Sequence, residues 1–78
     1  MHYVYILKQS DGNFYAGSTS NLEKRKQQHD DGQNLSTKDK RPLELIWSAQ
    51  FFSKKLAENF EKYLKSSSGF AFRNKHLI

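Results

Sequence analysis

Two tyrosines, an arginine and a histidine are the residues near the start of this chain whose types and spacing could do chemistry together. Tyr5 and Tyr15 lie in two short aromatic runs, and Arg25 and His29 follow, all within 25 residues. A phosphodiester is an anion whose hydrolysis needs a base, a cation to neutralise developing charge and, in most enzymes, a metal ion. These four residues supply candidates for the base and the cation, so the rest of the chain must supply a metal ligand.

A tyrosine in a strand is, taken alone, more often a core or edge aromatic than a catalytic group. Tyr5 and Tyr15 differ because a tight hairpin brings antiparallel neighbours to about 5 Å of each other. The ordinary pKa of a phenol is about 10, so it is a poor base unless a nearby cation lowers that pKa or a second base accepts its proton. The tyrosines therefore need charged partners close by.

Arg25 and His29 are the candidate partners. They are four positions apart, which places both on one face of a helix. Leu22 lies three positions before Arg25 and indicates that this face is near the packed side. The alternative is a solvated basic face, given the lysines beside Arg25, and the spacing favours neither interpretation. We interpret His2 and His76 as structural.

Glu61 is the candidate metal ligand. It borders the apolar stripe of a second predicted helix, between Ala57 and Leu64. A carboxylate at the edge of a core is costly to desolvate without a partner, and Mg²⁺ is commonly held by one carboxylate together with waters and phosphate oxygens. The alternative is a surface salt bridge to Lys62 or Lys65, which the sequence alone slightly favours.

Weaker signals point to contacts with a phosphate backbone. Ser18 and Thr19 could donate to a phosphate or simply cap the first helix. A basic loop could track a nucleic acid or only aid solubility, and its cations are Lys38, Lys40 and Arg41. The net charge of +5 favours attraction to polyanions.

Size and composition predict one small domain over residues 1–78. The hydrophobic share is 36% and the aromatic share 14%, so we expect a thin core rich in rings. The chain has no cysteine, which excludes disulfides and thiolate metal sites and suits a reducing cytoplasm. No run approaches the roughly 20 apolar residues of a membrane span, and the N-terminus does not read as a signal peptide. We expect a cytoplasmic protein that does not engage a membrane.

The first half of the chain predicts a hairpin followed by a helix. Residues 2–7 are β-branched and aromatic, which favours a strand. Alternation predicts one face with Tyr3, Tyr5 and Leu7 and an opposite face with His2, Val4 and Ile6. Asp11 and Gly12 indicate a hairpin turn, with a returning strand over residues 13–17. Ser20 and Glu23 then match a capping box at the start of a helix over about 21–30.

The second half predicts a long strand and two helices. Residues 42–51 form the strand, a helix capped by Ser53 runs to about Lys65, and a short last helix covers 70–78 after a loose spot at 66–69. The strand residues expected to share one face are Leu43, Leu45, Trp47, Ala49 and Phe51. The apolar stripe of the second helix consists of Leu56, Ala57, Phe60, Tyr63 and Leu64. The residues expected to anchor the last helix to the core are Phe70, Phe72 and Leu77. The fold class is α+β, a three-stranded antiparallel sheet flanked by helices in the order β-β-α-β-α-α.

The assembled residues resemble the GIY-YIG endonuclease superfamily, and in particular its small single-domain bacterial-type members. Tyrosine replaces the leading glycine of the first motif, and Ala16 replaces the usual branched residue of the second. The likeness covers essentially the whole chain, in order and spacing. The matching positions are Tyr3-Val4-Tyr5, Tyr15-Ala16-Gly17, Leu22, Arg25, His29, Ala57, Glu61, Leu64 and Lys65.

The resemblance implies metal-dependent cleavage of a DNA phosphodiester by water. Glu61 would hold a single Mg²⁺ or Mn²⁺ ion, and Arg25 would stabilise charge on the phosphate. Tyr5 would be the general base, Tyr15 would bind or orient the phosphate or the water, and His29 would support the tyrosines. We expect a DNA endonuclease in repair or recombination, with single-stranded and branched DNA among the candidate substrates.

Two other functions fit the same sequence. One is a non-catalytic nucleic-acid-binding module that retains the fold, motivated by the net charge and the basic loop. The other is a protein-interaction domain that uses exposed aromatic residues such as Phe70 and Phe72. The sequence does not indicate an oligomeric state.

Overall fold

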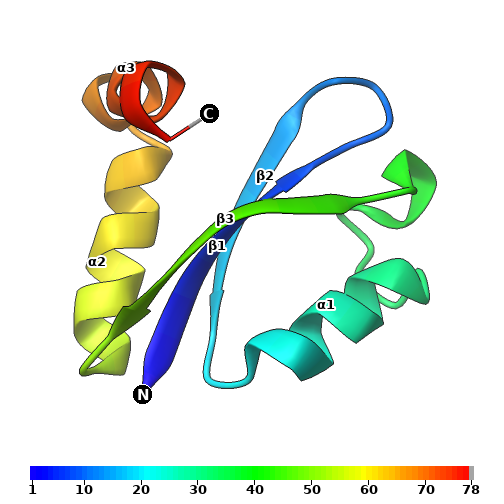
Figure 1. The fold of residues 1–78 in the computed structure, drawn as a ribbon, viewed down its shortest axis with the longest axis horizontal. Coiled ribbons are helices and arrows are strands. Elements are labelled where there is room, and N and C mark those ends of the chain that lie inside the picture. The colour runs from blue at the N-terminus through cyan, green and yellow to red at the C-terminus, as the bar shows by residue number, and fades with distance from the viewer. Residues whose placement is uncertain (78) are drawn as a thin grey trace.

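A computed structural model describes residues 1–77, which form a three-stranded antiparallel sheet between α1 on one face and α2 with α3 on the other (Figure 1). The strand order is β2-β1-β3, so β1 is the central strand. This arrangement confirms the predicted α+β class. No helix among these residues is long and apolar enough to cross a membrane. The elements are β1 (His2–Lys8), β2 (Phe14–Thr19), α1 (Leu22–Asp30), the 3₁₀ helix η1 (Lys38–Lys40), β3 (Glu44–Phe51), α2 (Lys54–Leu64) and α3 (Ser67–His76).

The central strand β1 is buried on both faces because helices cover both sides of the sheet. Val4 and Ile6 pack in one cluster with Ala57 of α2. Tyr5 and Leu7 point the other way and pack in a second cluster on the side of α1. The predicted alternation of β1 is thereby confirmed, and Tyr5 is placed on the face that α1 covers.

The strand β3 contains a bulge that the sequence prediction missed. Trp47 pairs with Ile6, but Leu45 pairs with Leu7, so β3 has one extra residue between these two pairs. Alternation changes phase across the bulge, and Leu43 packs on the α1 side while Trp47 packs on the α2 side. The prediction of a single apolar face along residues 42–51 is therefore wrong.

The start of α1 lies one residue later than the predicted capping box. Asn21 is the N-cap, and its side-chain oxygen accepts from the Lys24 N–H at 3.1 Å. Strand β2 runs on through Thr19, whose hydroxyl oxygen accepts from the Asn21 N–H at 3.1 Å. This turn fixes the register of the helix, so the predicted pairing of Ser20 with Glu23 is wrong.

The two C-terminal helices are capped by serines. Ser53 caps α2 as predicted, with its oxygen 3.2 Å from the Leu56 nitrogen. Ser66 caps α3 by accepting from the Gly69 N–H, so the segment predicted to be loose is the first turn of a helix. A Cβ on Gly69 would overlap the Tyr63 carbonyl group, because α3 crosses closely over the end of α2. The predicted last helix also included residue 78, which lies outside the described residues.

The predicted anchors of the last helix are only partly correct. Leu77 packs against the core, but Phe70 and Phe72 are 52% and 36% exposed. The buried side chain of α3 is Arg73, whose guanidinium lies 4.9 Å from the ring centre of Phe14 and 4.2 Å from that of Phe70. A cation stacked on aromatic rings thus holds α3 against β2.

The N-cap of α1 can be tested with two neighbouring alanine variants. We expect Asn21→Ala to lower the free energy of unfolding by about 1 kcal/mol, because it removes the acceptor for an orphan backbone N–H. Ser20→Ala is the matched control and should stay within about 0.5 kcal/mol of the parent protein. Urea unfolding measures both. A larger loss for Ser20→Ala than for Asn21→Ala would contradict the observed cap.

Candidate active site

Three of the predicted site residues form one aromatic cluster on the α1 side of the sheet. The Tyr5 hydroxyl oxygen lies 3.0 Å from Nε2 of His29, and His29 is fully buried. The ring centre of Tyr15 lies 6.3 Å from that of Tyr5 and 5.2 Å from that of His29. The hairpin and α1 therefore bring together residues that are 24 positions apart in sequence.

The Tyr5 ring lies directly across the backbone of β2. Tyr5 pairs with Gly17, and a Cβ at position 17 would lie 2.5 Å from the Tyr5 hydroxyl oxygen. Only a residue without a side chain leaves room for the phenol there. The glycine of the second motif thus allows Tyr5 to reach His29.

Burial pushes the two hydrogen-bonded groups toward their neutral forms. The pKa of Tyr5 is raised, first by burial and then by Tyr15, and the positive charge of Arg25 opposes the rise. The pKa of His29 is lowered, first by burial and then by Arg25. At neutral pH the site therefore holds a protonated phenol and an uncharged imidazole, with Arg25 close enough to act on both.

Glu61 approaches this cluster from α2, on the other face of the sheet. Its carboxylate lies 2.7 Å from Nζ of Lys65, which is one of the salt bridges considered from sequence. Burial acts to raise the pKa of Glu61, but Lys65 and Ser18, together with the charge of Arg25, outweigh it and hold that pKa below its ordinary value. Lys65 Nζ also lies 6.0 Å from the Tyr15 ring centre. The acidic group is therefore ionised and within electrostatic reach of the aromatic cluster.

The donor set around Glu61 fits an open cation site better than a closed one. Within residues 1–77 no group of three or more His, Asp or Glu side chains converges. Glu61 offers one ionised carboxylate whose side chain is 21% exposed. A hard divalent cation that keeps waters and takes substrate oxygens can use such a single ligand. The chemistry of Glu61 therefore suits Mg²⁺ or Mn²⁺. Binding of either ion at Glu61 stays a proposal.

The basic loop is tied to the rest of the chain. Lys40 pairs with Asp11 of the hairpin turn at 3.0 Å. Arg41 donates from Nε to the Lys38 carbonyl at 2.9 Å and from a terminal nitrogen to the Asp30 carbonyl at 3.3 Å. Two of the three cations predicted to track a nucleic acid thus have structural partners, and their contact with a substrate stays a prediction.

Ser18 and Thr19 also have partners within the chain. The Thr19 hydroxyl donates to the Asn21 carbonyl at 3.2 Å as well as accepting from its N–H. The Ser18 side chain acts on Glu61, whose pKa it lowers. Thr19 belongs to the turn before α1, and Ser18 to the surroundings of the carboxylate.

Thr37 is a buried polar neighbour of the site that the sequence did not indicate. Its hydroxyl oxygen lies 2.7 Å from Nδ1 of His29, and its side chain is fully buried. Thr37 lies in a polar loop without periodicity, so neither spacing nor composition distinguishes it from the other hydroxyl residues of the chain.

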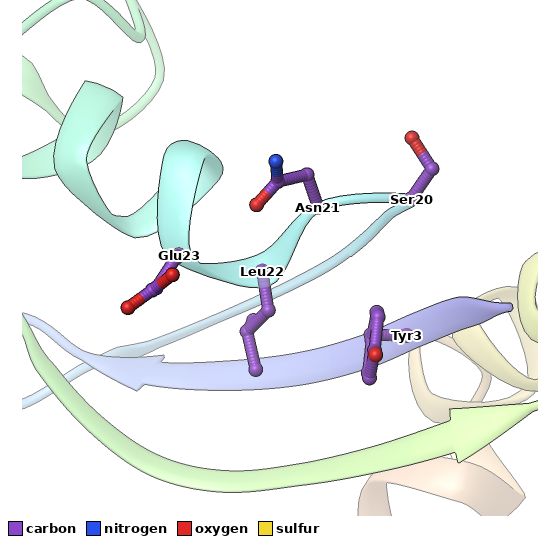
Figure 2. A pocket seen from close by; sticks show the side chains of 5 residues that line it. All are labelled: Tyr3, Ser20, Asn21, Leu22 and Glu23. Atoms are coloured by element: carbon purple, nitrogen blue, oxygen red, sulfur yellow. The ribbon is translucent and has the colours of Figure 1, made fainter.

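Surface hollows surround the start of α1. One hollow, of about 420 Å³, contains none of the five predicted catalytic residues. In Figure 2 its Leu22 side chain points toward β1, whereas Ser20 and Asn21 point away. A second hollow of about 350 Å³ on the polar side of α1 includes Arg25, so it is the better candidate for substrate access. The first is lined by Tyr3, Ser20, Asn21, Leu22 and Glu23, and the second by Thr19, Ser20, Asn21, Lys24, Arg25 and Gln28.

The family model for the GIY-YIG catalytic domain matches residues 1–75, and the chain belongs to the GIY-YIG family. This membership confirms the resemblance seen in the sequence and implies nuclease-type activity on a nucleic-acid substrate in general.

Individual relatives carry the family designation UPF0213. The UPF0213 protein YazA of Bacillus subtilis is 42% identical over 65 residues, which span 82% of this chain and 66% of YazA. A UPF0213 protein of Natronomonas pharaonis is 40% identical over 68 residues, covering 86% of this chain and 80% of its own length. The solution NMR structure of the UPF0213 protein BH0048 of Bacillus halodurans matches with a TM-score of 0.59 and 31% identity, over 95% of this chain and 82% of that one.

The close approach at Gly17 predicts a stability cost for a single added methyl group. We expect Gly17→Ala to lower the free energy of unfolding by about 1–3 kcal/mol, because the new Cβ displaces the Tyr5 ring. Ser48→Ala, an exposed change on the other strand that pairs with Tyr5, is the control and should change stability by less than about 0.5 kcal/mol. Equal stabilities of the two variants in urea unfolding would refute the contact.

The lowered pKa of His29 predicts a stability that depends on pH. The unfolded chain binds a proton at His29 more readily than the folded protein, so the free energy of unfolding should fall as the pH drops below about 6.5. Above that pH this contribution is fully present. His29→Gln should remove this part of the pH dependence, whereas His76→Gln, at an exposed position, should keep it. Urea unfolding between pH 5 and pH 8 makes the comparison, and parallel curves for His29→Gln and the parent would argue against it.

Proposed function

We propose that the protein is a divalent-metal-dependent endonuclease that hydrolyses DNA phosphodiester bonds. The supporting observation is the combination of a hydrogen-bonded Tyr5–His29 pair with a cation, Arg25, and an ionised carboxylate, Glu61, that both act on Tyr5. The proposed base, Tyr5, thus has beside it the other two components that phosphodiester hydrolysis needs, a cation and a candidate metal ligand.

Tyr5 is the proposed acceptor of the proton from the attacking water. In the free protein the raised pKa of Tyr5 keeps the phenol protonated, so the basic form must be favoured by the loaded site. Arg25 already lowers that pKa, and a substrate-bound cation would act in the same direction. Tyr15 is more exposed than Tyr5 and is proposed to orient the phosphate or the water.

Arg25 and Glu61 are proposed to manage charge at the phosphate. The Arg25 guanidinium would neutralise negative charge that develops on the phosphate oxygens. A Mg²⁺ or Mn²⁺ ion, when bound, would act as a Lewis acid on a phosphate oxygen and stabilise the leaving oxygen. Glu61 would hold this ion, and Lys65, which pairs with Glu61, would compete with it.

DNA is the proposed substrate, with single-stranded or branched forms in repair or recombination as the first candidates. The net charge of +5 supports attraction to a polyanion. A non-catalytic nucleic-acid-binding module is the second candidate, because the Lys65 salt bridge satisfies the Glu61 carboxylate without a metal.

A cleavage assay on single-stranded, duplex, flap and junction DNA, with Mg²⁺ or Mn²⁺, tests the proposal. We expect Glu61→Gln and Arg25→Ala each to lower the rate by about 100-fold or more, because each removes a charge that stabilises the transition state. The matched controls are Glu58→Gln and Lys55→Ala, which remove exposed charges on α2. These controls should cleave at nearly the parental rate.

Two results would count against the proposed site. Cleavage that survives both Glu61→Gln and Arg25→Ala would remove those residues from the mechanism. DNA binding that weakens steeply with salt, without cleavage under any metal condition, would favour the non-catalytic module.

A further inference from the structure

The fully buried hydroxyl of Thr37 continues the hydrogen-bonded chain that begins at Tyr5. One ring nitrogen of His29 lies 3.0 Å from the Tyr5 oxygen, and the other lies 2.7 Å from the Thr37 oxygen. Thr37 and His29 have no exposed surface. Hydrogen bonds therefore connect Thr37 to the proposed base, Tyr5, through the imidazole of His29.

The loop that carries Thr37 is held on both sides of the threonine. The Thr37 N–H donates to the Asn34 carbonyl, and its own carbonyl accepts from the Lys40 N–H. Lys40 is fixed to the hairpin turn by its ion pair with Asp11, and the Ser10 N–H donates to the Lys40 carbonyl at 2.9 Å. The basic loop thus fixes the position of a hydroxyl beneath the site.

The number of hydrogens shared by Tyr5, His29 and Thr37 decides which ring nitrogen of His29 carries the proton. The lowered pKa of His29 makes the ring neutral at neutral pH, so one nitrogen donates and the other accepts. Three hydrogens serve two hydrogen bonds, so one hydroxyl hydrogen is left over in either tautomer: that of Thr37 if Nδ1 donates, and that of Tyr5 if Nε2 donates. The Thr37 oxygen makes no other hydrogen bond within residues 1–77 and is fully buried, so its hydrogen would have no acceptor. Such an unpartnered buried donor is costly. The Tyr5 hydroxyl instead lies beside Arg25, which lines a surface hollow, so a bound substrate could accept its hydrogen.

We propose that Thr37 is a positioning residue that donates its hydroxyl hydrogen to Nδ1 of His29 and so fixes the tautomer with the hydrogen on Nε2. In that tautomer His29 donates to the Tyr5 oxygen. His29 then stabilises negative charge on the phenol and does not take its proton, which leaves the hydrogen of Tyr5 for the substrate. The inference deepens the proposed nuclease function, on which its kinetic part rests.

The ring nitrogens of His29 in the parent protein give a readout that does not depend on activity. We expect ¹⁵N-labelled protein at pH 7.5 to give a protonated Nε2 and an unprotonated Nδ1 in long-range ¹H–¹⁵N correlation spectra. His29→Gln identifies the signals by their loss. A protonated Nδ1 would overturn the proposal, whether or not the protein cleaves DNA.

The kinetic test compares Thr37→Val with Thr37→Ser. Valine keeps the shape of threonine without the hydroxyl, so we expect kcat for DNA cleavage to fall about 10-fold or more with KM for DNA unchanged. Serine keeps the donor and should restore most of kcat, and Ser36→Ala on the exposed neighbouring position should have no effect. Assays run well below each variant's melting temperature separate this loss from unfolding.

The outcomes separate the two proposals. A parental kcat for folded Thr37→Val, or a loss that serine does not restore, would overturn the role of Thr37 while leaving the nuclease function intact. Absence of cleavage by the parent protein would refute the nuclease function, and the tautomer measurement would still decide whether Thr37 sets the state of His29.

Discussion

The buried hydrogen bond between Tyr5 and His29 is the interaction on which the rest of the structure depends. It joins the central strand to α1 by a buried contact of 3.0 Å. Gly17 is needed because the phenol crosses the neighbouring strand to make this bond. Thr37 bonds the other ring nitrogen of His29, so this histidine also positions the loop after α1. Strand, hairpin, helix and loop are thus fixed around two side chains that lie at the candidate site.

The same burial that stabilises this pair determines its chemistry. Removing a phenol and an imidazole from water raises the pKa of Tyr5 and lowers that of His29, so both groups are neutral in the free protein. The charges of the site lie around the pair, with Arg25 on α1 and Glu61 on α2. Any catalytic role of Tyr5 therefore depends on how these outer charges, and those of a substrate, act on a buried neutral group. The charges that could change the ionisation of Tyr5 are therefore those of Arg25, Glu61 and a bound substrate.

Much of the fold and of the cluster could be predicted from sequence, because the signals were local. Alternation in residues 2–7 placed Tyr5, and the spacing of Arg25 and His29 placed both on one helix face. The extra residue of β3 depends on pairing between distant strands, and local alternation carries no sign of it. The hydrogen bond between Thr37 and His29 could not be predicted either, because Thr37 lies in a loop without periodicity after the end of α1. The cap of α1 was missed by one residue because Thr19 and Asn21 form a turn that competes with a capping box.

The cations of this chain divide into those that build the fold and those that remain near the site. Arg73 is stacked between aromatic rings, and Lys40 and Arg41 hold the loop beneath His29. A net charge of +5 therefore overstates how much positive charge is free to meet a polyanion, because part of it is committed to internal contacts. Arg25 differs, since it is half-buried, lines a surface hollow and acts on the pKa of Tyr5. Because Lys40 and Arg41 hold the loop that carries Thr37, changes in the basic loop should act on the site through Thr37 and His29 as well as through the electrostatic field at the surface.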